Sequence, residues 1–88
     1  MQYFVYIIAT KVKNKTISYV GYTSDLSKRL NDHNTGKGAK FTRGKKWTLI
    51  YKEMHKSKSK AISREYYIKN NRTLRNKIKN ESLNIITL

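Results

Sequence analysis

The run YFVYIIA, residues 3–9, constrains the fold of this chain more than any other segment. It is continuously apolar and rich in β-branched and aromatic side chains, which is typical of a strand buried on both faces. We therefore expect this segment to be the central strand of a sheet. The run TISYVGYT, residues 16–23, predicts a second strand after the polar connection KVKNK, so the two strands are expected to form a β-hairpin.

The number of residues in the hairpin connection decides which side chains share a face. If that number is even, the numbers of two paired residues add up to an odd number. Tyr6 and Tyr19 then lie on the same face of the hairpin, either opposite or diagonal to each other. We expect their two phenol groups to converge.

A helix is predicted directly after the second strand. Thr23 or Ser24 is expected to cap it, Asp25 suits its first turn, and the sequence NTGKG ends it near Asn34.

Two polar residues of this helix lie beside its apolar stripe, which consists of Leu26 and Leu30. At about 100° per residue, Arg29 and His33 are about 60° and 20° to one side of Leu26. We therefore expect both side chains along the edge of the core rather than on the far, solvent-facing side.

The rest of the chain predicts one more strand and two more helices. The run WTLIYKEMH, residues 47–55, has the bulk and alternation of a strand. Ser57 or Ser59 can cap a helix that begins near Lys58, and a last helix is expected over residues 72–80. The order of elements is then β-β-α-β-α-α, which is an α+β fold.

The length of 88 residues favours a single domain, residues 1–88, because a chain of this size buries only one core. No apolar run reaches the length of a bilayer span, and the first residues lack the pattern of a secretory leader, so we expect a cytoplasmic protein. The absence of cysteine excludes disulfides, thiolate zinc sites and cysteine nucleophiles.

The charge balance predicts a polyanionic partner. The chain has 20 Lys and Arg residues against 5 Asp and Glu, which gives a net charge of +15. Because the basic residues run through every segment, they indicate a broad basic face that binds phosphates rather than a detachable tail. Membrane binding is not expected, since no basic segment has an extended apolar face with a Trp or Phe anchor.

The sequence GKGAKFTRGKK, residues 36–46, is interpreted as a flexible connection that contacts phosphates. Of the aromatic residues in and beside it, Phe41 and Trp47 can stack on an unpaired base, although a core position is favoured for Trp47. The expected nucleic-acid contacts of the whole chain are Arg29, Lys37, Lys40, Arg43, Lys45, Lys46 and Lys69.

Glu65 is the acidic residue whose predicted position needs an explanation. On the helix that begins near Lys58, the expected buried arc consists of Ala61, Ile62 and Ile68. Glu65 lies about 40° from Ala61, inside this arc. A carboxylate on an apolar stripe is costly to bury unless it is paired or binds a metal. Two explanations are open here, a salt bridge with an Arg or Lys and a divalent cation.

A single carboxylate together with tyrosines, an arginine and a histidine suits metal-assisted hydrolysis of a phosphodiester. In such chemistry a cation polarises the phosphate, a guanidinium stabilises the charged transition state, and a phenol or imidazole takes a proton from water. Tyrosine is a weak base at its ordinary pKa of about 10, but nearby cations favour the phenolate, and this chain is strongly basic.

These residues occur in an order that resembles a known family. Tyr6 ends the sequence FVY, the sequence YVG begins at Tyr19, and Arg29, His33 and Glu65 follow. With this pattern the chain resembles the GIY-YIG endonuclease domain, from the first strand through SREYYIK. The segments YVGYTSDLSKRLNDHN and GKGAKFTRGKKWTLIYKE are similar to those of its compact stand-alone bacterial members.

The resemblance implies a three-stranded antiparallel sheet flanked by helices, and a nuclease centre that uses one divalent ion, Mg²⁺ or Mn²⁺. By position, Tyr6 and Tyr19 would be the two motif tyrosines, with Tyr19 as the general base or water-orienting group. Arg29 would hold the scissile phosphate, and His33 occupies a helix position that is His or Tyr in relatives. Glu65 would be the metal ligand.

The chain departs from the family pattern in three places. The first motif reads FVY instead of GIY, which keeps the tyrosine and loses the glycine. Tyr22 follows YVG where the DNA-repair excinuclease relatives carry a lysine. The asparagine that some relatives place after the glutamate has three candidates here, Asn70, Asn71 and Asn76, and none is assigned.

The leading hypothesis is a DNA endonuclease that is structure-selective or weakly specific, and branched DNA, single-stranded DNA and RNA are all open as substrates. The alternative is a nucleic-acid-binding module of the same fold with little or no catalysis, and a third is a basic ribosome-associated protein. These hypotheses differ at Glu65, which an enzyme needs as a ligand and a binding module does not. Selectivity is expected from the basic face, from nucleic-acid shape or from a partner protein, since no appended DNA-binding domain is predicted.

Overall fold

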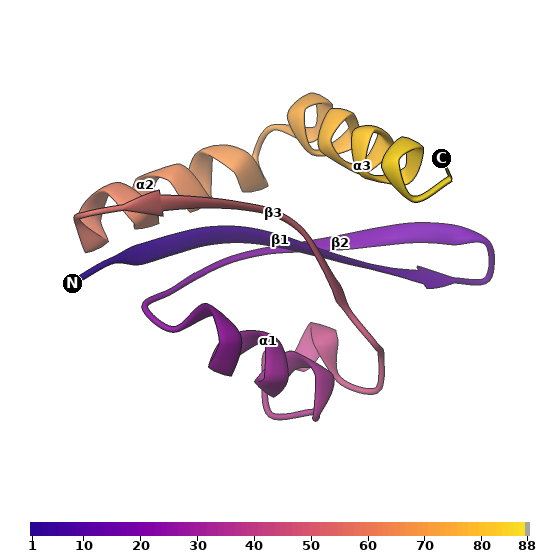
Figure 1. Ribbon diagram of the computed structural model, residues 1–88, viewed down its shortest axis with the longest axis horizontal. Coiled ribbons are helices and arrows are strands. Elements are labelled where there is room, and N and C mark those ends of the chain that lie inside the picture. The colour runs from indigo at the N-terminus through magenta and orange to yellow at the C-terminus, as the bar shows by residue number, and fades with distance from the viewer. Residues whose placement is uncertain (88) are drawn as a thin grey trace.

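The computed structural model describes residues 1–87, and the side chains of residues 1–81. Three strands form one antiparallel sheet in the order β2-β1-β3. Helix α1 and a short 3-10 turn, η1, cover one face of this sheet, and α2 and α3 lie on the other face (Figure 1). The predicted α+β fold and its order of elements are confirmed. The elements are β1 (Tyr3–Val12), β2 (Lys15–Thr23), α1 (Leu26–Asn34), η1 (Lys40–Thr42), β3 (Thr48–His55), α2 (Lys58–Lys69) and α3 (Arg72–Thr87).

Strand β1 is the central strand because its side chains are apolar on both faces. Val5 and Ile7 belong to a core cluster beneath α2 and α3, together with residues of those helices. Tyr6 and Ile8 point to the opposite face, where they pack with Trp47. All four of these strand residues are buried, as the continuous apolar run predicted.

The hairpin between β1 and β2 closes with only two residues. Lys13 and Asn14 both have positive φ, 49° and 68°, as a type I′ turn requires. The loop length is therefore even, and the strands run longer than the sequence predicted. Ile8 pairs with Tyr19 across the hairpin, which places Tyr6 and Tyr19 diagonally on one face, as expected.

The cap of α1 differs from the prediction. Asp25 is the N-cap, and its carboxylate accepts a hydrogen bond from the Lys28 amide at 3.1 Å. Thr23 instead stabilises the turn before the helix, because its hydroxyl accepts from the Asp25 amide at 3.1 Å. The helix ends at Asn34 as predicted. There the Asn34 side chain bonds to the backbone of Trp47 and ties the helix to the start of β3.

Helix α2 has a narrower buried face than the sequence predicted. Ala61 and Ile68 are fully buried, whereas Ile62 is 43% exposed, so its expected place in the core is wrong. Ile62 lies about 100° around the helix from Ala61, beyond the stripe that meets the sheet. Ser57 is the N-cap of this helix, which decides between the two predicted caps. Within residues 1–87, no helix is both long and apolar enough to cross a membrane.

Candidate active site

Five predicted site residues come from four elements. Tyr6 is on β1, Tyr19 on β2, Arg29 and His33 on α1, and Glu65 on α2. We call these five residues the tyrosine–histidine site. Tyr6, Tyr19 and His33 are in direct contact, whereas Arg29 and Glu65 are connected to them through electrostatic effects and through Lys69, as described below.

Tyr6 and His33 form the buried centre of this site. The Tyr6 hydroxyl lies 2.8 Å from His33 Nε2, and His33 Nδ1 lies 2.9 Å from the Thr42 hydroxyl. Thr42 has one hydroxyl proton, which it donates to the Ala39 carbonyl at 2.8 Å, so its oxygen must accept from His33 Nδ1–H. His33 Nε2 is then unprotonated and accepts a hydrogen bond from the Tyr6 hydroxyl. Hydrogen bonding thus fixes the imidazole tautomer and makes Tyr6 a donor.

Burial keeps both groups of this pair neutral. Desolvation raises the pKa of Tyr6 to about 12, although the nearby Arg29 guanidinium opposes the rise. Tyr19 and Glu65 add smaller increases to the Tyr6 pKa, so both lie within electrostatic range of the phenol. Desolvation lowers the pKa of His33, and Arg29 lowers it further. At neutral pH Tyr6 is therefore a phenol rather than a phenolate, and the pair faces one fixed cation, Arg29.

Two glycines make room for these side chains. A Cβ on Gly21, which pairs with Tyr6 across the hairpin, would overlap the Tyr6 phenol, with 2.6 Å to its Cζ. A Cβ on Gly38 would lie 2.5 Å from His33 Nδ1 and 3.0 Å from its Cα. The glycine of the YVG motif is thus explained by the close approach of a tyrosine ring rather than by a positive φ.

Tyr19 forms the wall of the site next to the Tyr6–His33 pair. Its ring meets the His33 ring edge-on at 5.2 Å and stacks on Phe41 at 6.2 Å with a 21° tilt. Phe41 is 53% exposed, whereas Trp47 is buried as expected and donates its indole N–H to the Thr42 carbonyl at 2.9 Å. Of these two aromatic residues, only Phe41 presents a ring to solvent.

Glu65 is half-buried and paired. Its side chain is 17% exposed, and Oε1 lies 2.9 Å from the Lys69 ammonium, one turn further along α2. The same ammonium lies 5.9 Å from the centre of the Tyr19 ring. Lys69, expected as a nucleic-acid contact, thus lies between Glu65 and Tyr19. The position of Glu65 beside the buried stripe is as predicted, and of the two explanations the salt bridge is present.

The donor set around Glu65 fits a divalent ion only in an open type of site. Among the described residues, no three His, Asp or Glu side chains converge on one point. A cage built only from protein ligands is therefore not formed. Mg²⁺, however, usually keeps several waters and binds through one or two carboxylates together with substrate phosphates. The accessible carboxylate of Glu65 fits this arrangement, with Lys69 as a competing cation.

Arg29 connects the site to an open pocket of about 570 Å³. The pocket lies where β1 begins and β2 ends, and Tyr22, the departure from the family motif, is part of its lining. Lys58, the first residue of α2, brings an ammonium to the same pocket. Two cations from different helices thus line a space that can receive a phosphate. The lining residues are Met1, Tyr3, Tyr22, Thr23, Ser24, Arg29 and Lys58.

The connection over residues 36–46 is more structured than its glycine content predicts. It contains η1 and the fully buried Thr42. Lys45 is half-buried, its ammonium 3.3 Å from the Phe41 carbonyl and 5.7 Å from the Phe41 ring. The other predicted contacts of this segment are exposed; these are Lys37, Lys40, Arg43 and Lys46.

Two of the asparagine candidates have structural roles. Asn71 accepts from the Leu74 amide at 3.0 Å, at the start of α3, and Asn70 donates to the Tyr66 carbonyl at 2.9 Å. Asn76 is exposed on α3. No described hydrogen bond joins these side chains to the tyrosine–histidine site, and the role stays unassigned.

Sequence reasoning missed Thr42, Gly38 and Lys58. A threonine in a Gly-rich loop has no periodicity that would place it in a core, and the collision of Gly38 with His33 depends on how the loop folds back. Lys58 is one lysine among many. Their roles follow only from contacts between segments that are distant in the sequence.

Thr42 is expected to act as a positioning residue. Thr42→Val keeps the shape of the side chain but leaves His33 Nδ1–H without its partner, whereas the Ala39 carbonyl keeps the bond from the Thr42 amide at 3.0 Å. An unsatisfied buried polar group costs about 1–3 kcal/mol, so the free energy of unfolding should fall by about that amount in urea titrations. Nitrogen-15 NMR of the His33 ring should also show loss of the fixed tautomer. Thr42→Ser, which keeps the hydroxyl, should retain it; an unchanged tautomer in the valine variant would contradict this role.

Comparison with known proteins gives a consistent set of matches. Residues 2–79 match the model of the GIY-YIG catalytic domain. A UPF0213 protein of Staphylococcus haemolyticus is 45% identical over 69 residues, which cover 77% of this chain and 80% of the relative. One of Clostridium perfringens is 48% identical over 67 residues, which cover 75% and 69%. The solution NMR structure of a UPF0213 protein from Bacillus halodurans has a TM-score of 0.53 and 34% identity, over 91% of this chain and 84% of that one.

Proposed function

This chain belongs to the GIY-YIG family, as its motifs predicted, and from this membership we propose that it is a metal-dependent endonuclease that hydrolyses phosphodiester bonds in DNA. The family has a nuclease-type function and acts on nucleic acids, generally with a divalent metal. The observation that carries the proposal is the grouping of Tyr6, Tyr19, His33 and Glu65 beside a pocket lined by Arg29. We propose structure-selective or weakly specific cleavage. The described residues form one sheet with its helices, so the contacts that select a substrate would come from the basic surface of this unit and from the shape of the nucleic acid.

In the proposed mechanism, cations bind the scissile phosphate. Arg29 supplies a planar guanidinium that suits two phosphate oxygens, and it stabilises the charge that develops in the transition state. Lys58 adds a second positive charge in the same pocket. Strand β2 supplies no charge there, because it has Tyr22 where some relatives have a lysine. Glu65 would hold Mg²⁺ or Mn²⁺, which supplies Lewis-acid polarisation of the phosphate.

The tyrosines have different proposed roles. Tyr6 is a buried phenol that donates its proton in a hydrogen bond to His33, so it is unsuited as a base. Its proposed role is to hold the His33 ring in place. Tyr19 is held in place by His33 on one side and Phe41 on the other. We assign to Tyr19 the orientation and deprotonation of the attacking water. His33 then sets the positions of both rings.

A cleavage assay tests this function. The purified protein is incubated with labelled duplex, branched and single-stranded DNA, and with RNA, in the presence of Mg²⁺, Mn²⁺ or EDTA. Cutting of at least one DNA substrate that requires the metal and stops in EDTA is expected. Binding without cutting on every substrate and with both metals would contradict the proposal.

One observation favours a second function, a nucleic-acid-binding module without catalysis. Glu65 already has a counter-ion in Lys69, which is what a purely structural carboxylate would need. The basic surface alone would then account for binding, through phosphate contacts and release of counter-ions. A module of this kind would bind DNA or RNA equally well in Mg²⁺ and in EDTA.

A further inference from the structure

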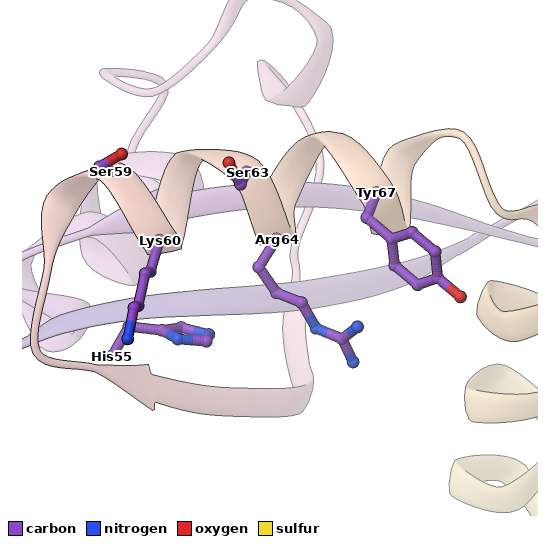
Figure 2. Close-up of a pocket in the computed structure, with 6 residues that line it drawn as sticks. All are labelled: His55, Ser59, Lys60, Ser63, Arg64 and Tyr67. Atoms are coloured by element: carbon purple, nitrogen blue, oxygen red, sulfur yellow. The ribbon is translucent and has the colours of Figure 1, made fainter.

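A second basic pocket lies on the other flank of α2, away from Glu65. It has a volume of about 370 Å³ and is bounded by the end of β3 and the outer side of α2. Figure 2 shows Lys60, Arg64 and Tyr67 projecting from the same side of the helix, with His55 at the end of the strand. We call it the β3–α2 pocket. Its lining residues are His55, Ser59, Lys60, Ser63, Arg64 and Tyr67.

The charges of the β3–α2 pocket favour an anion. No acidic residue lines it, whereas Lys60 and Arg64 are cations, and Ser59 and Ser63 carry hydroxyl donors. Within the described part of the chain, Lys60 makes no salt bridge. The pocket therefore holds at least one positive charge that no carboxylate of the described residues neutralises.

The nearby carboxylate of Glu53 does not line the pocket but holds the side chain of Arg64, which does. Both Glu53 oxygens bond to Arg64 through one atom, Nε, at 2.9 and 3.1 Å. The same carboxylate accepts from Tyr51 at 3.1 Å and lies 3.0 Å from His55 Nε2. The Glu53 carboxylate thus bonds to three neighbouring side chains. Arg64 bonds to this carboxylate through Nε and not through its terminal amino groups.

Arg64 is held in place from two directions. Glu53 fixes its Nε, and its guanidinium carbon lies 5.1 Å from the centre of the Tyr67 ring. The hydrogen bond to Glu53 also raises the pKa of Arg64, so the charge is permanent. A guanidinium with a fixed plane, whose terminal amino groups do not bond to Glu53, suits two oxygens of a phosphate, because little side-chain entropy is lost on binding.

We propose that the β3–α2 pocket is a second nucleic-acid contact site, which binds a backbone phosphate away from the scissile bond. Arg64 and Lys60 neutralise the phosphate, and the serine hydroxyls donate to its oxygens. The proposal rests on the proposed function only in that the polyanion is the nucleic-acid substrate.

The position of the pocket makes it distinct from the tyrosine–histidine site. Tyr19 lies on β2 and His55 on β3, and these two strands are the opposite edges of the sheet. Neighbouring strands are about 4.8 Å apart, so the two edges are about 10 Å apart before side chains are counted. A nucleic acid that occupies both sites must therefore extend beyond the width of the sheet, so only substrates longer than a few nucleotides can occupy both.

The salt dependence of binding tests this proposal. The affinity of the full chain for a fluorescent 16-base-pair duplex is measured in EDTA, so that no cleavage occurs, between 50 and 200 mM NaCl. Loss of one phosphate contact lowers the slope of log K against log salt by about 0.9. Lys60→Gln should therefore lose about three- to fourfold less affinity over this range than the unmodified protein does. Lys11→Gln, which removes another exposed lysine, near the hairpin turn, is the matched control and should keep the original slope.

A second measurement locates the contact directly. Addition of the duplex should shift the amide resonances of Ser59 and Ser63 in the unmodified protein, and less so in Lys60→Gln. Equal slopes for Lys60→Gln and Lys11→Gln, with no shift at the two serines, would overturn the proposal, because the binding would then be diffuse surface charge. Cleavage with metal together with that result would leave the nuclease function standing. A slope that depends on Lys60, without cleavage in any metal, would support the pocket and contradict the nuclease.

Discussion

Glu65→Gln is expected to lower the rate of metal-dependent cleavage by about 10²- to 10³-fold. Glutamine keeps the size of the side chain but has no negative charge, so it holds a divalent ion weakly. Lewis-acid stabilisation of a phosphate is worth several kcal/mol, and each 1.4 kcal/mol corresponds to about tenfold in rate. The affinity for DNA should change little, because Glu65 is half-buried and carries the wrong charge for a phosphate contact.

The measurement is single-turnover cleavage at saturating Mg²⁺ or Mn²⁺, with DNA affinity and the affinity for Mn²⁺ determined in parallel. Glu81→Gln is the control, because it removes the same charge from an exposed position on α3. Its cleavage rate should match that of the unmodified protein. A Glu65→Gln variant that cuts normally, or that loses only thermal stability, would show that the carboxylate serves as a structural partner of Lys69.

Gly21→Ala is expected to damage both stability and the geometry of the site. The new methyl group would collide with the Tyr6 phenol, which is buried and bonded to His33 and so has no room to move away. Overpacking of a core typically costs about 1–3 kcal/mol. For a domain of this size the melting temperature should fall by about 4–8 °C for each kcal/mol.

Gly36→Ala separates this collision from a simple backbone effect. Gly36 has a φ of +81°, and no atom lies within 4 Å of the place that a methyl group would take, so alanine there meets strain but no neighbour. The left-handed conformation costs a non-glycine residue about 1–2 kcal/mol. Calorimetry should thus show both variants destabilised, whereas NMR of the His33 ring should be altered only in Gly21→Ala. An unaltered His33 signal in Gly21→Ala would contradict the proposed contact.

The hairpin and the first helix illustrate how far local patterns can be used. An apolar run without alternation predicted a strand covered on both faces, and Tyr6 and Ile8 are indeed buried opposite Val5 and Ile7. The sequence predicted both tyrosines on one face only if the hairpin loop is even, because side chains alternate with a period of two, and the two-residue turn in the structure meets that condition. The helical period likewise predicted that His33 lies at the edge of the core, since residues 26, 30 and 33 share one side of a helix.

Helix α2 shows where the same reasoning is insufficient. The wheel placed Glu65 beside the core correctly but could not choose between a cation and a salt bridge, because the partner depends on side-chain packing. It also placed Ile62 in the core, although the width of a buried stripe depends on the curvature of the surface that the helix meets. The alternation of the third strand predicted no special role for Glu53, but its carboxylate bonds to Arg64, His55 and Tyr51.

The sequence by itself determined the order of strands and helices and the family, because these follow from local periodicity and the order of a few residues. The hairpin register was decided by the two-residue turn at Lys13 and Asn14 that the structure shows. The tertiary structure alone decided that Thr42 fixes the tautomer of His33. It also decided that Gly21 and Gly38 lie so close to the rings of Tyr6 and His33 that a Cβ would not fit. It also decided that α2 presents Glu65 on one flank and Arg64 on the other. These relations join segments far apart in the chain, and hydrogen bonds and close contacts of that kind depend on distances that no local pattern encodes.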